Sequence, residues 1–148
     1  MRHILYVLSL ILLSGWPLAG IGAEPPRHEH FVVKSTEQSR EAVLAAIRDY
    51  TDASSDWVYL SEVPLRRGAF TLVKLCYIPA AGDIFAAGRH VSALLPCGHL
   101  SLYAEAGRTH LSMLHPRFMT TLSPGPEMER AVAKATPAFE ALLEAVLD

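Results

Sequence analysis

The chain has 148 residues, 51% of them hydrophobic, and a formal net charge of −2 at pH 7. This length is enough for one domain around one core and too short for two. A mildly acidic chain lacks the basic surface that binds nucleic acid or anionic membranes. We therefore expect neither among its partners.

Residues 1–23 have the layout of a secretory signal peptide. A short basic start, residues 1–3, precedes an apolar stretch, residues 4–13, and small residues follow up to Ala23. The apolar stretch is about ten residues long, whereas a helix that crosses a membrane needs roughly 20. We expect cleavage after Gly22 or Ala23 and an exported protein, periplasmic or secreted, without a membrane anchor; an uncleaved N-terminal anchor is the alternative. The mature chain would carry 12 basic and 15 acidic residues, a formal charge of −3.

The mature part is predicted to begin with a flexible lead-in, residues 24–30, and a short strand, residues 31–33. Ser35 and Gln38 have the spacing of a capping box, which predicts the start of a helix there. Three apolar residues of this helix recur on one face and place its end near the last of them: Val43, Ile47 and Tyr50.

Two strands are predicted at residues 57–60 and 70–78, where aromatic and β-branched residues gather. We expect Pro64 to end the first of them. Asp83 is placed to cap a short helix over residues 84–90.

Residues 99–104 and 109–114 are predicted to form a β-hairpin with its tight turn at Ala106 and Gly107. This register gives one apolar face, on which Leu100 lies opposite Met113 and Leu102 opposite Leu111. The opposite face then holds these pairs: His99 with Leu114, Ser101 with Ser112, and Tyr103 with His110.

A helical turn over residues 116–122 and a long terminal helix complete the chain, and we expect Pro137 to kink or divide the long helix. The predicted order of elements is β-α-β-β-α-β-β-α. Strands linked by hairpins, with helices between them, favour an α+β fold of two layers: a mostly antiparallel sheet of about five strands with helices on one face. We expect a single domain over residues 31–148.

Three short segments resemble the DUF-302 family, a group named for its unknown function. They are residues 73–79, which end in Cys-Tyr-Ile-Pro, residues 84–87, and Leu-Leu-Pro-Cys at residues 94–97. His115-Pro116 and the terminal helix also fit the pattern. The resemblance implies a compact α+β fold and a homodimer, and it implies no established reaction.

The sequence departs from that family pattern at two places. Gly98-His99 stands where the family often has Asn, and His115 stands where the family often has Asp or Asn. A function that those positions carry in the family would be altered here.

Cys76 and Cys97, the two cysteines of the chain, have three possible states. In an oxidising compartment they could form a disulfide that closes a loop of about 20 residues and contributes about 3 kcal/mol. They could instead be separate buried apolar residues, or one could be a reactive or metal-binding thiolate. The sequence leaves all three open.

Histidines near Cys97 raise the question of a metal site. In the predicted register His99 and His110 share a face but lie about 13 Å apart along the strand, so they cannot bind one ion together. His115 falls on the other face from His99. Cys97 and His99 remain as neighbours on one face, weak candidates for a metal pair, and Cu(I) is the ion that such soft ligands would take outside the cytoplasm.

The sequence contains no Ser-His-Asp order, phosphate-binding loop or dinucleotide fingerprint, so an enzyme is not the favoured prediction. We expect a dimeric binding module that holds a small ligand or an exported partner protein on the polar strand face of His99, Ser101, Tyr103 and His110. The alternative is a thiol-redox or copper-handling protein that uses Cys97 with Cys76, His99 or both.

Overall fold

The computed structural model describes residues 29–94 and 97–148, and the side chains of residues 98 and 99 lie outside that description. In this part of the chain, one antiparallel sheet has the strand order β1-β5-β4-β3-β2. The strands are β1 (Phe31–Thr36), β2 (Trp57–Leu65), β3 (Phe70–Tyr77), β4 (Cys97–Glu105) and β5 (Arg108–Leu114). The helices are α1 (Arg40–Asp52), α2 (Ala81–Ala87), α3 (Phe118–Leu122) and α4 (Pro126–Leu147). Short 3₁₀ segments are η1 (Arg66–Gly68), η2 (Ile78–Ala80) and η3 (Arg89–Leu94).

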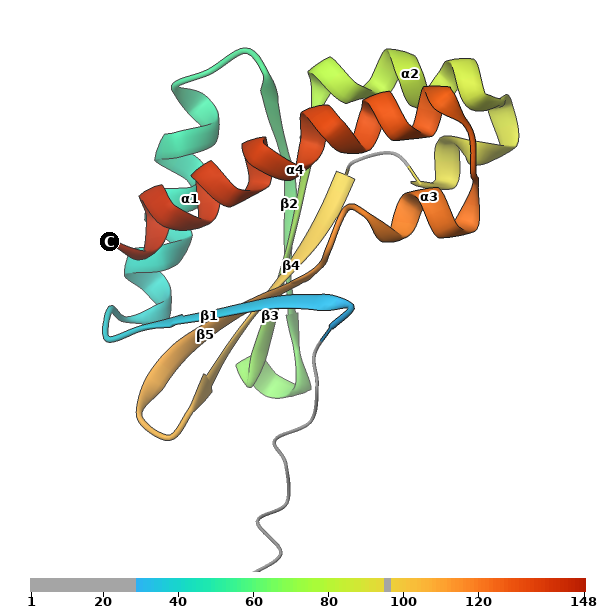
Figure 1. Cartoon of the computed structure of the whole chain (residues 1–148). Helices are drawn as coiled ribbons and strands as arrows, with labels where there is room; N and C mark the ends of the chain where they lie inside the picture. Colours follow the sequence, from blue (N-terminus) through green and yellow to red (C-terminus); the bar gives the residue numbers. More distant parts are fainter. Residues whose placement is uncertain (1–28, 95–96) are drawn as a thin grey trace, which may run out of the picture.

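Figure 1 shows the helices gathered on one side of the strands, with α4 crossing the layer. The predicted α+β class, with an antiparallel sheet and helices, is therefore confirmed. The predicted signal peptide falls on residues outside the description. No helix within the described ranges is both long enough and apolar enough to span a membrane.

One face of the sheet forms the core because strand side chains alternate between the two faces. Its fully buried residues are Val73 and Leu75 of β3, Leu100 and Leu102 of β4, and Leu111 of β5. Helix α4 packs on this face with side chains that recur at helical spacing: Met128, Ala135, Phe139, Leu142 and Val146. The amphipathic pattern of α4 therefore supplies the second layer.

The opposite face of the sheet, which we call the open face, carries the side chains that alternate with the buried ones. The cross-strand pairs place these residues on it: Val63 and Leu65 of β2, Phe70, Leu72 and Lys74 of β3, Ser101 and Tyr103 of β4, His110, Ser112 and Leu114 of β5, and Phe31 and Val33 of β1. None of these open-face residues is buried, in contrast to their neighbours in the core.

The sheet forks at one end because β4 and β5 separate there. Their pairing runs from Glu105–Arg108 to Ser101–Ser112 and stops. Beyond that pair β4 continues along β3 as far as Cys76–Cys97, while β5 continues along β1 as far as Phe31–Leu114.

The predicted hairpin is correct near its turn and wrong at the fork. The pairs Ser101–Ser112, Leu102–Leu111 and Tyr103–His110 form as the register predicted. The expected pairs Leu100–Met113 and His99–Leu114 are absent from the β4–β5 ladder of the described chain. At this end β4 stays paired with β3, and β5 stays paired with β1, so the sheet divides into these two halves.

The predicted start of the first helix is wrong. Ser35 lies in β1 and pairs with His110, because the edge strand continues its ladder with β5 to Thr36. The helix begins at Arg40, and the side chain of Ser39 caps it by accepting a hydrogen bond from the backbone N–H of Ala42 at 3.1 Å.

Pro64 does not end its strand, which continues to Leu65. Strand β2 is the edge of the sheet, and an edge strand tolerates a proline because its outer backbone groups need no partner strand. Asp83 does not cap a helix at residue 84, since α2 already begins at Ala81. Its carboxylate instead accepts hydrogen bonds from Arg130 and Lys134 of α4. Helix α4 runs through Pro137 as one helix.

Replacing Ile84 by Ala should lower the free energy of unfolding by about 2–5 kcal/mol, because its side chain is fully buried and truncation leaves a cavity. The neighbouring Phe85 is 53% exposed, so Phe85→Ala should change stability by about 0.5 kcal/mol or less. Urea unfolding of both variants tests which face of α2 packs on the core. Equal losses in the free energy of unfolding for the two variants would contradict this packing.

Candidate functional site

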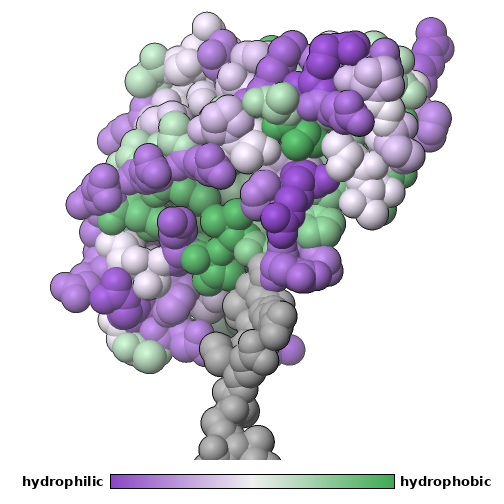
Figure 2. Space-filling model, in the orientation of Figure 1, coloured by the Kyte–Doolittle hydropathy of each residue, from purple (hydrophilic) through white to green (hydrophobic). Residues whose placement is uncertain are grey.

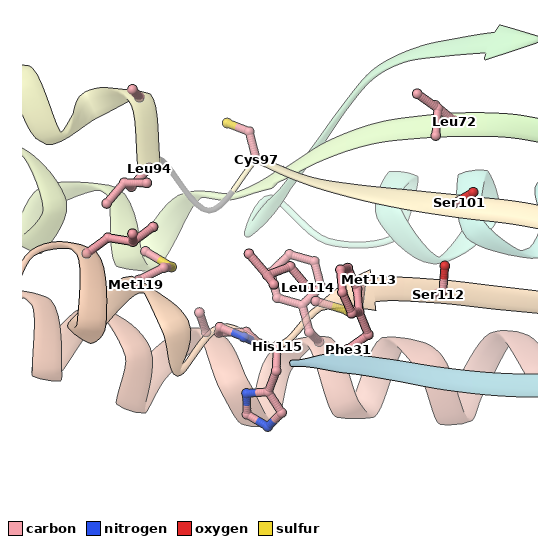
Figure 3. A pocket seen from close by; sticks show the side chains of 15 residues that line it. Phe31, Leu72, Leu94, Cys97, Ser101, Ser112, Met113, Leu114, His115 and Met119 are labelled. Atoms are coloured by element: carbon pink, nitrogen blue, oxygen red, sulfur yellow. The ribbon is translucent and has the colours of Figure 1, made fainter. Parts of the chain in front are cut away.

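A pocket of about 330 Å³ opens at the fork between β4 and β5 (Figure 3). The two strands run side by side at Ser101 and Ser112 and lie further apart at Cys97 and Leu114. The described residues that line it come from the open face, the core and the helices: Phe31, Leu72, Ala93, Leu94, Cys97, Ser101, Ser112, Met113, Leu114, His115, Pro116, Met119, Leu122, Ala135 and Phe139.

The lining is mostly apolar. Phe139 and Ala135 of α4 are buried, whereas Phe31 and Leu114 are 51% and 47% exposed, so the cavity runs from the helix layer to the open face. The hydroxyls of Ser101 and Ser112 supply polar side-chain atoms. The described lining contains no Lys, Arg, Asp or Glu.

The backbone adds further polar groups at the fork. Beyond Ser112, β5 has no ladder partner on its β4 side within the described chain. Unpaired backbone N–H and C=O groups of a strand require water or a ligand as partner. The pocket therefore combines an apolar body with a few hydrogen-bonding groups on one wall, which is the usual composition of a small-molecule site.

Cys76 and Cys97 form a disulfide, with their sulfur atoms 2.04 Å apart. The two residues are the last pair of the β3–β4 ladder, so the bond holds the start of β4 to the end of β3 on one side of the fork. Its loop contains Ala93 and Leu94, which line the pocket together with Cys97. In this state neither sulfur is a thiolate that could attack a substrate or bind a metal ion.

The predicted polar face is divided by the structure. Ser101 lies in the pocket, whereas Tyr103 and His110 stack on each other further along the hairpin, with ring centroids 5.2 Å apart and planes 13° apart. Phe70 extends this aromatic group at 5.8 Å from Tyr103. The side chain of His99, the expected partner of Cys97, lies outside the described residues. Within the description, no three His, Cys, Asp or Glu side chains gather as a metal site.

The sequence analysis did not identify most residues of the pocket. Leu72 and Met119 come from separate elements and belong to no motif, and Leu94 was noted only as the first residue of the Leu-Leu-Pro-Cys segment. An apolar residue that lines a cavity has the same sequence pattern as one that fills the core. Only the position of the fork distinguishes the two.

His115 lies between this pocket and a second one, of about 310 Å³, beside Glu140 and Lys34. Figure 3 shows its imidazole turned away from Cys97 and Leu94. The backbone N–H of Arg117 donates to His115 Nδ1 at 3.1 Å, so the neutral ring carries its proton on Nε2. Burial, and secondarily the charge of Arg117, lower the pKa of His115, while the Glu140 carboxylate opposes the shift.

Residues 58–146 match the family model described as "Domain of unknown function DUF302". None of the curated proteins matches this chain. Among solved structures, an uncharacterized conserved protein DUF302 from Bacillus stearothermophilus is similar in fold, with a TM-score of 0.69. It is 13% identical, and the similarity covers 79% of this chain and 98% of that one. At this identity the likeness concerns the fold alone.

The lowered pKa of His115 predicts a loss of stability on acidification. Below about pH 6.5 the unfolded chain takes up a proton that the folded state resists, so the free energy of unfolding falls until the pH reaches the folded-state pKa. The His115→Asn variant keeps an acceptor for the N–H of Arg117 and removes this titration. Compared with the variant, the wild-type chain should therefore lose stability between pH 7.5 and pH 5.

Urea unfolding at both pH values measures the difference, and the other histidines cancel because both proteins contain them. The lowered pKa of His115 would be contradicted if the stability difference between the wild-type chain and the variant did not change with pH. It would also be contradicted if acid made the wild-type chain the relatively more stable of the two.

Proposed function

The chain belongs to the DUF302 family, whose function is unknown, and on that premise we propose that it is an exported, non-catalytic module that binds a small, uncharged and mostly apolar molecule. The observation that supports this proposal is the pocket at the fork of the sheet. The pattern of residues 1–23 supports export.

The size and lining of the pocket favour a small ligand. Ligand sites usually have volumes of roughly 300–1,000 Å³ and place a few polar groups in an apolar lining. A cavity of about 330 Å³ is at the lower end of that range. The paired hydroxyls of Ser101 and Ser112 could donate to or accept from one polar group of the ligand.

The lining also favours an uncharged ligand. An ion that leaves water needs a partner of opposite charge, and the described lining residues include neither Lys and Arg nor Asp and Glu. The lowered pKa of His115 keeps that side chain neutral near pH 7. A charged molecule would therefore lose its hydration without an ionic partner in return.

Two fluorescent probes that differ by one charged group test this proposal. N-phenyl-1-naphthylamine is neutral, and 8-anilino-1-naphthalenesulfonate has the same rings with a sulfonate. Fluorescence titration of the purified chain should show saturable binding of the neutral probe at one site per chain. The anionic probe should bind at least tenfold more weakly.

A pair of serine variants locates the binding site. Ser101→Phe fills the pocket and should weaken binding of the neutral probe at least tenfold. Ser61→Phe is the matched control, because Ser61 pairs with Lys74 on the same face of the sheet but does not line the pocket. It should change the Kd less than twofold. The proposal fails if the neutral probe does not saturate, or if both variants bind it equally.

The alternative function, thiol exchange or copper handling, is supported by the position of Cys97 on the pocket wall and by the incomplete burial of both cysteines. In an exchange, a thiolate of an external dithiol would attack Cys97 Sγ and release Cys76 as a thiolate. The second thiol of that dithiol would then displace Cys97. Two electrons would pass to the pair, and the external dithiol would become a disulfide. The reduced pair offers two thiolates, which are soft ligands for Cu(I).

Equilibration in glutathione buffers of defined potential separates this alternative from a structural bridge. The midpoint reduction potential of a redox-active pair should lie above about −250 mV. A structural disulfide should have a midpoint potential of about −300 mV or below. Alkylation and mass measurement report the thiols, and Cu(I) titration of the reduced chain should reach one ion per chain. The Cys76→Ser, Cys97→Ser double variant is the control. A bridge that resists reduction, in a chain that binds no Cu(I) when reduced, would exclude the alternative.

A further inference from the structure

We infer that the free edge of β1 is a docking site for an extended peptide segment in which one basic residue lies between two apolar residues. The segment adds a strand to the sheet and places its basic side chain in the groove between β1 and α4. This inference goes beyond the proposed function, because it concerns a different surface and a different class of partner.

The two edge strands of the sheet differ in how they are protected against pairing with another chain. Strand β2 carries Pro64 and a register shift between Tyr59 and Ser61, and both features interrupt the outer hydrogen-bonding groups of an edge. Strand β1 pairs with β5 in an unbroken register from Phe31 to Thr36 and contains no proline. A regular edge rich in β-branched residues is a template for an added strand.

The backbone groups of Phe31 and Val33 point away from β5. The N–H of His115 donates to the C=O of His30 at 2.9 Å, so these two opposite residues form a hydrogen-bonded pair. Such pairs alternate along an antiparallel ladder, so Val32 bonds to β5 whereas Phe31 and Val33 present their N–H and C=O groups to the outer side. In the described sheet β1 is the last strand, and no strand lies beyond it.

Two arginines occupy backbone carbonyls on either side of this open stretch. The guanidinium of Arg108 donates to the C=O of Ser35 at 3.3 Å, and the guanidinium of Arg117 donates to the C=O of Glu29. The open part of the edge lies between them. It is long enough for a short segment of about five extended residues.

A groove of about 310 Å³ lies on the helix side of this edge. Its lining comes from β1, from α4 and from the residue that follows β5: Val32, Lys34, His115, Glu140, Leu143 and Glu144. Leu143 is buried and Val32 half-buried, whereas the lysine and both glutamates are exposed. Because the lowered pKa of His115 keeps its ring neutral near pH 7, the groove has one net negative charge. A basic side chain is therefore complementary to it.

The side chains of an added strand alternate between this groove and the open face. On the open face they lie beside Val33 and Phe31, which is 51% exposed, so apolar residues fit there. Figure 2 shows hydrophobic residues gathered on the surface next to the place where the described chain begins, with hydrophilic residues around them. On the helix side, the residue opposite Val32 enters the groove, whereas Lys34 repels a second basic residue opposite itself. These positions define one basic residue between two apolar ones.

A second copy of this chain fits the edge less well than such a segment. Two copies joined edge to edge in one continuous sheet keep their helix layers on the same side, so their acidic grooves meet across the two-fold axis. Like charges that face each other oppose association. Strand β1 also lacks the required pattern, since its lysine, Lys34, stands between Val33 and Ser35.

An NMR titration of the isotopically labelled, purified chain tests this inference with the peptide acetyl-Thr-Val-Arg-Val-Thr-amide. We expect saturable shifts of the backbone amides of Val33 and its neighbours in β1, and of the groove residues of α4. A second peptide with Glu in place of Arg should bind about tenfold more weakly, because it adds a third carboxylate to the groove.

Two pairs of variants locate the binding site. Val33→Pro removes the outward N–H, leaves the ladder with β5 intact and should weaken binding of the arginine peptide about fivefold. Val33→Thr keeps that N–H and should change the Kd less than about twofold. The Glu140→Gln, Glu144→Gln double variant should also weaken binding about fivefold and remove most of the preference for the arginine peptide. Glu129→Gln, at the other end of α4, should not.

The double glutamate variant changes only exposed side chains and tests the site independently of the proline. An arginine peptide that shows no saturable binding up to about 1 mM would overturn this inference. Binding that neither Val33→Pro nor the double variant weakens would place the peptide elsewhere and overturn it too. Shifts of the β1 amides that grow with chain concentration, and that the peptide does not reverse, would assign the edge to a second copy instead. The pocket at the fork is tested separately by N-phenyl-1-naphthylamine.

Discussion

The separation of β4 from β5 is the constraint on which the site depends. Strand β4 follows β3 to the Cys76–Cys97 pair, whereas β5 follows β1 to Phe31–Leu114. A continuous ladder between β4 and β5 would fill the gap with backbone hydrogen bonds and close the opening. Because the ladder stops at Ser101–Ser112, the sheet itself provides the entrance to a cavity floored by α4.

The disulfide lies within one half of the forked sheet, and helix α4 packs beneath the sheet. The bond joins β3 to β4 at the last pair of their ladder, and Ala135 and Phe139 of α4 lie against the cavity. The ion pairs of Asp83 with Arg130 and Lys134 join α2, which lies within the disulfide loop, to α4. The surface position of these ion pairs makes them a modest contribution beside the apolar core.

Much of the fold was predictable from local patterns. The turn at Ala106 and Gly107 and the alternation of Leu100 and Leu102 were sufficient for the hairpin near its turn, and helical spacing was sufficient for the terminal helix. The failures involve competition between elements. Ser35 has a good capping pattern, but pairing along β5 extended the strand through it, and Pro64 was tolerated because β2 is an edge.

The sequence by itself determined the α+β class and the acidic charge; it predicted export from residues 1–23 and left a bridge between the two cysteines open. These properties follow from composition and from the periods of apolar residues along the chain. Only the tertiary structure decided where the sheet forks, which described residues surround the cavity and which sheet face the described helices leave open. Such features depend on how distant segments compete for the same neighbour, and an apolar residue has the same local pattern in a core, a pocket or an open face.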